Sequence, residues 1–111
     1  INEFNIFHGL LKNTNSKEMK QIVDEYLKKY LNCIVIIISL EDSKATIVIG
    51  LSDKISDIFD ACQLVRIATP HLGGSGGGGR KTLAQGGGNN VKNAKEVIDV
   101  IIEEVEKNLA S

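Results

Sequence analysis

A run of six apolar residues, Cys33 to Ile38, constrains the fold of this chain more than any other feature. The last five, residues 34–38, are all isoleucine or valine, and β-branched residues favour the pleated strand. A strand with no polar alternation is typical of one buried on both faces. The run is far too short to cross a membrane as a helix, which takes about 20 residues. The chain must therefore place other elements on both sides of a central strand at residues 33–40.

The rest of the chain alternates between strand and helix patterns. Apolar stretches predict further strands at residues 4–11 and 45–51, and the second of these forms a hairpin with the central strand across polar residues 41–44. Apolar residues at helical spacing predict three amphipathic helices, at residues 16–30, 52–68 and 91–109. The order β-α-β-β-α-glycine loop-β-α predicts a single α/β domain over residues 1–111, with a mixed β-sheet.

Local signals indicate where the three helices begin and end. Asn15 or Ser16 is expected to cap the first helix by accepting a bond from a free backbone N–H. Pro70 is expected to help end the second by forcing Thr69 away from helical angles. Asn93 and Glu96 have the spacing of a capping box at the start of the third. The predicted buried stripes are Met19, Ile22, Val23, Tyr26, Leu27 and Tyr30; Ile55, Ile58, Phe59, Cys62, Val65 and Ala68; and Ala94, Val97, Ile98, Ile101, Ile102, Val105 and Leu109.

The composition is that of an ordinary globular domain. Of the 111 residues, 42% are hydrophobic and 24% charged, so the chain can fold without a disulfide or a metal. Cys33 and Cys62 lie in apolar segments and are expected to be buried free thiols, which fits a reducing, cytoplasmic compartment. No basic-then-apolar signal opens the chain, and we expect no membrane partner. The chain begins at Ile1 without a methionine, so we expect a fragment of a longer protein.

Side chains suited to catalysis form no recognisable pattern. His8 lies in an apolar strand and is expected to be structural, and His71 follows Pro70 and is expected in a turn. No His, Cys and Asp set has metal-ligand spacing, and no nucleophile has a partner base in the pattern of a catalytic triad. We therefore predict no catalytic residue, no metal and no cofactor.

Nine of the eleven glycines lie between Gly73 and Gly88. Such a run is usually a flexible linker, but this one lies between structured elements and encloses a short strand in the stretch Arg80 to Gln85. The P-loop motif fails, because Arg80 stands where a glycine must precede Lys81. The dinucleotide pattern matches at Gly74, Gly76 and Gly79, but it follows a helix rather than a strand. We expect several of these glycines at positive φ, where the backbone can approach an anion closely.

Charge is distributed unevenly along the chain. The net charge is −1, yet no Asp or Glu occurs between Ala61 and Lys95. That stretch holds the basic residues Arg66, Arg80, Lys81, Lys92 and Lys95, together with His71. A local cationic segment is the expected footprint for a phosphate backbone, although solvated surface lysines produce the same pattern.

The pattern Gly-Gly-Ser-Gly-Gly-Gly-Gly-Arg, followed by Leu-Ala-Gln-Gly-Gly-Gly and an amphipathic helix, resembles the DHH-associated domain that ends alanyl-tRNA synthetases. The resemblance implies a non-catalytic module of a class II alanine–tRNA ligase that contacts the phosphate backbone of tRNA at its outer corner and assists aminoacylation and editing. It implies tRNA and the other synthetase domains as partners, and it implies a possible homodimer, because in that family the domain can contribute to dimerisation. The expected RNA-binding residues are Gly74, Gly76, Gly77, Gly78, Gly79, Arg80, Lys81, Gln85, Gly86, Gly87, Gly88, Lys92 and Lys95.

Two other functions stay open at this point. The chain is also similar to the substrate-binding C-terminal domain of DHH-family nucleases and phosphodiesterases, which often have a histidine just after the glycines. Arg80 occupies that place here and favours the synthetase branch. The third hypothesis is a protein-interaction or dimerisation module in which the glycine loop is structural.

Overall fold

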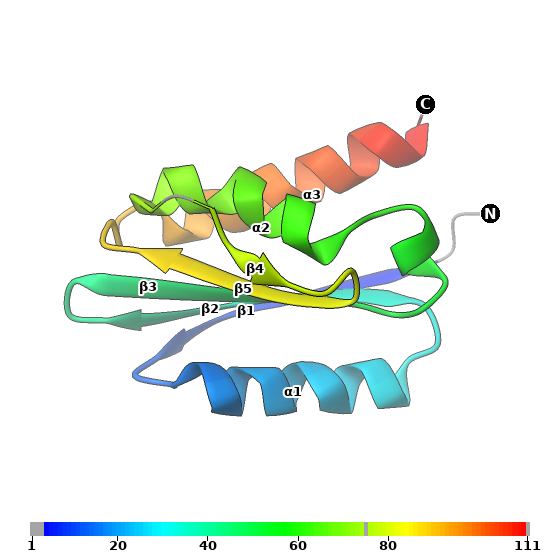
Figure 1. Ribbon diagram of the computed structural model, residues 1–111, viewed down its shortest axis with the longest axis horizontal. Coiled ribbons are helices and arrows are strands. Elements are labelled where there is room, and N and C mark those ends of the chain that lie inside the picture. Colours follow the sequence, from blue (N-terminus) through cyan, green and yellow to red (C-terminus); the bar gives the residue numbers. More distant parts are fainter. Residues whose placement is uncertain (1–3, 75, 111) are drawn as a thin grey trace.

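A five-stranded mixed sheet lies at the centre of the computed structural model, which describes residues 4–74 and 76–110 (Figure 1). The strands are β1 (Asn5–Lys12), β2 (Cys33–Glu41), β3 (Lys44–Leu51), β4 (Gly78–Gly79) and β5 (Leu83–Gly88). Their order across the sheet is β1-β2-β3-β5-β4. β1 is parallel to β2, and the other neighbouring pairs are antiparallel. The predicted α/β class with a mixed sheet is confirmed.

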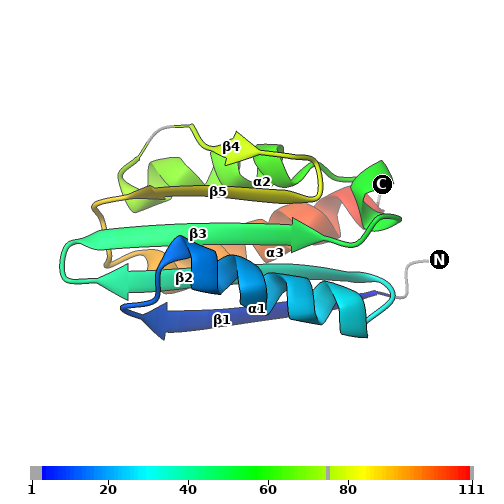
Figure 2. The ribbon, with the colours of Figure 1, turned by 60° about the horizontal axis from the view of Figure 1, so that its bottom comes forward.

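Helices cover both faces of this sheet. The helix α1 (Ser16–Lys29) lies on one face, and α2 (Ala61–Ala68) and α3 (Ala94–Ala110) lie on the other (Figures 1 and 2). Two short 3-10 helices, η1 (Ile55–Asp57) and η2 (Thr69–Leu72), flank α2. None of the helices in the described part of the chain is long and apolar enough to span a bilayer.

The central strand β2 explains why helices are needed on both faces. Val35 and Ile37 pack with Met19 and Val23 in the core cluster beneath α1. The alternate residues of β2 join the larger cluster beneath α2 and α3; these are Ile34, Ile36 and Ile38. All five side chains of residues 34–38 are buried, so the prediction of a strand covered on both sides is confirmed.

The predicted second helix is wrong over its first nine residues, because α2 begins only at Ala61. The Asp60 carboxylate accepts a bond from the backbone N–H of Cys62 at 2.8 Å and caps the helix there. Upstream, the Ser52 hydroxyl bonds to the backbone of Cys33 and ties that segment to β2 instead. Ile58, predicted to be buried, is 59% exposed as a result.

The mechanism predicted for Pro70 is also wrong. α2 does end at Ala68, but Thr69 keeps helical angles, with φ −62° and ψ −34°. Pro70 stands at the start of the 3-10 helix η2, where its missing N–H costs little because the first residues of a helix have no intrahelical acceptor. The chain therefore passes directly from the α-helix α2 to the 3-10 helix η2 and keeps helical backbone angles at Thr69.

The first and third helices match their predicted spans closely. Asn15 caps α1 by accepting from the backbone N–H of Glu18 at 2.8 Å. Tyr26, expected on the buried face, is 37% exposed, and α3 begins at Ala94 rather than Val91. The buried stripe of α3 is confirmed at Ala94, Val97, Ile98, Ile101 and Val105, with Ile102 half-buried, while the side chain of Leu109 lies outside the described residues.

Candidate nucleic-acid interface

The glycine segment forms part of the sheet. β4 pairs with β5, and β5 pairs with β3, so the segment supplies the last two strands on the side of the sheet opposite β1. The predicted short strand overlaps β5 only at residues 83–85, because Arg80 to Thr82 form a turn, and Gly86, Gly87 and Gly88 belong to β5 and not to a second turn. A Cβ on Gly86 would lie 2.6 Å from the Thr69 side chain and 2.8 Å from that of Val65. Glycine there allows α2 and η2 to pack directly on the strand.

The predicted positive φ angles are confirmed at three glycines. Gly73 has φ +77° and ends η2, Gly76 has φ +73°, and Gly79 has φ +145° beside the turn into β5. Other residues rarely adopt these angles. The glycine run therefore has a defined course that leads the chain into and out of β4.

A tight turn at Arg80 to Thr82 joins β4 to β5. The Arg80 N–H donates to the Leu83 carbonyl at 2.8 Å, closing the turn. The Lys81 carbonyl accepts from the first N–H of α2, at Ala61, and the Thr82 carbonyl accepts from the N–H of Leu51; both distances are 2.8 Å. Backbone bonds from two other elements thus hold the turn in place, while the side chains of Arg80 and Lys81 are exposed.

The other predicted binding residues are not all near this turn. Lys92 and Lys95 are exposed at the start of α3, beyond the opposite end of β5. The six residues of β5, which span roughly 17 Å, lie between the two cationic groups along the chain. Gln85 lies between them in β5, half-buried and paired across the strands with Gly78. Its side-chain oxygen is buried and has no hydrogen-bond partner among the residues that the structure describes.

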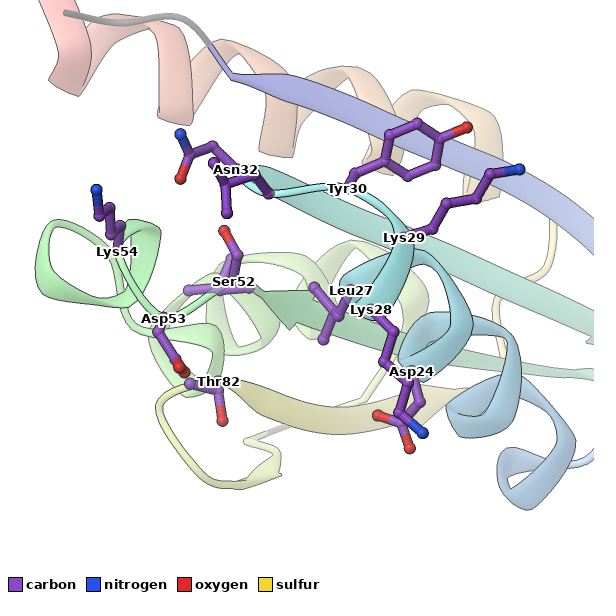
Figure 3. A pocket seen from close by; sticks show the side chains of 12 residues that line it. Asp24, Leu27, Lys28, Lys29, Tyr30, Asn32, Ser52, Asp53, Lys54 and Thr82 are labelled. Carbon is purple, nitrogen blue, oxygen red and sulfur yellow. The ribbon is translucent and has the colours of Figure 1, made fainter.

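The fold also brings acids to the turn that the sequence pattern did not indicate. Asp60 caps the helix whose first N–H bonds to Lys81. Asp53 lines a pocket together with Thr82 (Figure 3). The absence of acids between residues 61 and 95 therefore overstates the positive potential around Arg80 and Lys81.

The pocket beside the turn contains cations that sequence reasoning missed. It has a volume of about 610 Å³ and lies between the end of α1, the end of β3 and Thr82 (Figure 3). Three lysines and two aspartates line it: Lys28, Lys29, Lys54, Asp24 and Asp53. They come from two segments of the chain far from the glycine motif, so no local pattern signals that they meet beside Thr82.

The histidines and cysteines have the following surroundings. His8 is exposed on β1. His71 is exposed in η2, and its carbonyl accepts from the Asn93 side chain at 3.4 Å. Cys33 is buried and Cys62 half-buried, and both are free thiols. Within residues 4–74 and 76–110, no three His, Cys, Asp or Glu side chains gather closely enough to hold a metal ion.

Comparison with known proteins gives a consistent result. The family model described as the DHHA1 domain matches residues 3–107. The alanine–tRNA ligase of Thermotoga sp. (strain RQ2) is 37% identical over 98 residues, which are 88% of this chain and 11% of the ligase. That of Hyphomonas neptunium is 32% identical over 101 residues, 91% of this chain and 12% of the ligase. The chain thus spans only about a tenth of the length of these curated relatives.

Two solved structures resemble the fold. The C-Ala domain from Aquifex aeolicus alanyl-tRNA synthetase has a TM-score of 0.83 and 32% identity, over 88% of this chain and 87% of that one. The DHH domain of a member of the s1p family of ribosomal proteins has a TM-score of 0.57 and 21% identity, over 84% of this chain and 21% of that one. The second likeness concerns the fold alone.

Proposed function

This chain belongs to the DHHA1 domain family, among the C-terminal domains of alanyl-tRNA synthetases, and from that premise we propose that it holds tRNA without acting on it. The ligand is the tRNA phosphate backbone at the outer corner of the molecule. The parent is an alanine–tRNA ligase of the cytoplasm, and holding the tRNA there assists its aminoacylation and editing.

The observation that carries this proposal is the turn at Arg80 to Thr82. Its carbonyls are held by Ala61 and Leu51, so the two exposed cations project from a fixed backbone. Arginine can grip a phosphate through two parallel N–H bonds, while lysine acts as a point charge. Arg80 is therefore the main contact and Lys81 supports it. Such contacts position an RNA backbone without reading its bases.

A double substitution, Arg80→Ala with Lys81→Ala, tests the proposal. We expect weaker binding to every tRNA by a similar factor, and a salt dependence that flattens by roughly one unit of slope for each phosphate that the variant no longer binds. The measurement is tRNA affinity of the 111-residue domain over a range of salt concentrations, starting at low salt. Thermal unfolding should be unchanged, because both side chains are exposed.

Two controls make this result interpretable. Lys107→Ala removes one exposed cation near the end of α3, far along the sequence from the turn, and should leave the salt slope unchanged. Lys92→Ala with Lys95→Ala tests the second cationic group. If the Arg80 and Lys81 double variant binds with native affinity and slope, the turn is not the RNA site. If the unsubstituted domain binds no tRNA at low salt, the proposed function itself fails.

The proposal includes that the isolated domain has no catalytic activity. The isolated domain should neither activate alanine nor deacylate charged tRNA, and it should not hydrolyse short oligonucleotides with Mn²⁺ or Mg²⁺. Reproducible metal-dependent hydrolysis by a clean preparation would instead support the substrate-binding domain of a nuclease. In the parent ligase, deleting this domain should raise the KM for tRNA and leave tRNA-independent activation of alanine unchanged.

A further inference from the structure

The pocket beside Thr82 has an apolar interior and a polar rim (Figure 3). Leu51 is buried at the end of β3, and Leu27 is half-buried in the last turn of α1. Four exposed charged side chains surround them: Lys28, Lys54, Asp24 and Asp53. The volume of about 610 Å³ falls within the range of roughly 300–1,000 Å³ that is typical of small-molecule sites. The pocket is therefore large enough for a small organic ligand.

The pocket presents hydrogen-bond acceptors that the described residues leave unused. The side-chain oxygen of Asn32 is buried, yet no group in the described part of the chain donates to it. The carboxylates of Asp24 and Asp53 have no partner within residues 4–74 and 76–110 either. The Ser52 hydroxyl, by contrast, bonds to the backbone of Cys33. Buried acceptors are normally paired, so the pocket suits a ligand that brings an N–H donor to Asn32.

Two cations on the rim are free to meet an anion. Lys28 and Lys54 are exposed on two sides of the pocket, and neither forms an ion pair within the part of the chain that the structure describes (Figure 3). Lys29 is engaged, because its Nζ lies 5.6 Å from the centre of the Tyr30 ring. A lysine ammonium group attracts phosphate as a point charge. The rim therefore suits a ligand with a phosphate on each side.

We propose that the pocket binds one unpaired nucleotide of the RNA strand whose backbone lies on the turn, an inference that rests on the proposed function. Thr82 belongs both to the turn and to the lining of the pocket, so a strand held at Arg80 and Lys81 passes directly beside the opening. The base enters the apolar interior, and its exocyclic amino group donates to the Asn32 oxygen. A nucleotide within a strand has a phosphate on each side, which matches the two lysines of the rim.

This site adds base recognition to the backbone contact at the turn. Cytosine carries an amino group at the position where uracil carries a carbonyl oxygen, and the two bases have nearly the same size. The Asn32 oxygen accepts a hydrogen bond from the amino group and none from the carbonyl. The pocket therefore prefers cytidine to uridine by roughly 3- to 10-fold, the factor that corresponds to one net hydrogen bond.

Fluorescence anisotropy with single-stranded oligocytidylate and oligouridylate of equal length tests this preference in the 111-residue chain. We expect Asn32→Leu to lower the affinity for oligocytidylate to that for oligouridylate and to leave the latter unchanged. Gln21→Leu is the matched control, because Gln21 is an exposed amide on α1 outside the pocket. Asn32→Leu should unfold in urea no earlier than the native chain, since the oxygen that it removes has no partner within the described residues. Asn32→Ala repeats the test with a smaller side chain.

Two double variants test the phosphate contacts. Lys28→Ala with Lys54→Ala should weaken binding of both oligonucleotides by the same factor and flatten the salt dependence of each. Lys17→Ala with Lys107→Ala removes two exposed cations outside the pocket and should leave both affinities unchanged. Equal affinity of the native chain for the two oligonucleotides overturns the base site while tRNA binding at the turn stands, and so does a preference that survives Asn32→Leu. A chain that binds neither tRNA nor the oligonucleotides overturns the proposed function as well.

Discussion

The glycines between Gly73 and Gly88 serve the fold in different ways. A Cβ on Gly74 would collide with the carbonyl of Gly87, so the close approach of the two chain segments requires glycine there. A Cβ on Gly78 would meet nothing within 4 Å, and the φ angle of Gly78 lies outside the left-handed region. In the sequence these two positions look the same. Only the packing of one strand segment against another separates them.

Alanine substitutions at these two glycines should therefore change the free energy of unfolding differently. We expect Gly74→Ala to lower the free energy of unfolding by about 1–3 kcal/mol, because the added methyl group overpacks a backbone contact. Gly78→Ala should be neutral or stabilising by up to about 1 kcal/mol, since it restricts the unfolded chain without strain. Urea unfolding of both variants checks this. Equal destabilisation would mean that β4 needs its glycine for a reason other than space or backbone angle.

The buried thiol of Cys33 should make stability depend on alkaline pH. Burial raises the pKa of this thiol above its ordinary value of 9.0, because the protein interior disfavours the thiolate. The folded state then keeps the proton more tightly than the unfolded state. Its stabilising contribution is complete below about pH 9 and is lost as the pH rises above that value.

The difference between the native chain and Cys33→Ala measures this effect, because lysines and tyrosines titrate in the same range in both. We expect the free energy of unfolding of the native chain to fall more steeply than that of Cys33→Ala as the pH rises from about 8.5 to about 10.5. Parallel curves would show that the thiol does not contribute. Iodoacetamide at about pH 8 should label Cys62 in the folded protein well before Cys33, which is fully buried.

At the scale of the element, helices and strands with strong apolar periodicity were predicted well. The start of α2 was predicted wrongly, because a capping residue and not the apolar spacing determines it. The strand at residues 33–40 and the helix from Ser16 followed from dense β-branched residues and an apolar stripe, and both are present. The region from Ser52 to Asp60 carries helical spacing too, but Asp60 caps a later start. β5 contains three glycines and has little intrinsic strand preference. Its place beside β3 comes from tertiary packing, which no local pattern predicts.

The cap at Asp60 should stabilise both α2 and the turn that α2 holds. Asp60→Ala removes the acceptor for the Cys62 N–H, and we expect the free energy of unfolding to fall by about 1 kcal/mol. Asp60→Asn keeps a side-chain oxygen in the same place and should unfold close to the native chain. Asp99→Ala, an exposed acid on α3, controls for the change of charge. If Asp60→Asn is as unstable as Asp60→Ala, the contribution is electrostatic and the cap is secondary.

At the scale of the whole molecule, we expect the domain to fold without a disulfide or a metal. Buried side chains fill both faces of the sheet, and neither cysteine is in a disulfide. We expect the isolated chain to unfold reversibly in urea with the same midpoint in the presence or absence of dithiothreitol and EDTA. A midpoint lowered by either reagent would reveal a cross-link or a structural metal. A single domain over residues 1–111 predicts one cooperative transition.

At the scale of the whole molecule, the sequence did not predict which charged residues surround the turn at Arg80 to Thr82. Composition predicted that Arg80 and Lys81 would be exposed cations, and they are. It did not predict that Asp60 would come beside them, nor that a pocket with lysines from α1 would open next to Thr82. Charge near a site depends on which distant segments the topology brings together. A linear count of acids and bases describes only the residues of one segment.

The hydrogen bonds to the turn at Arg80 to Thr82 affect how this part of the chain could be exchanged between genes. Its carbonyls depend on Leu51 at the end of one strand and on Ala61 at the start of a helix. A genetic exchange that carried the glycine-rich stretch into another protein would transfer the cations but leave behind the groups that orient them. Exchange between relatives should conserve the site only when the crossover falls outside residues 51–83. A gene segment that encodes only the glycine motif would therefore not preserve the orientation of the turn. Residues 51–83 would have to be exchanged together.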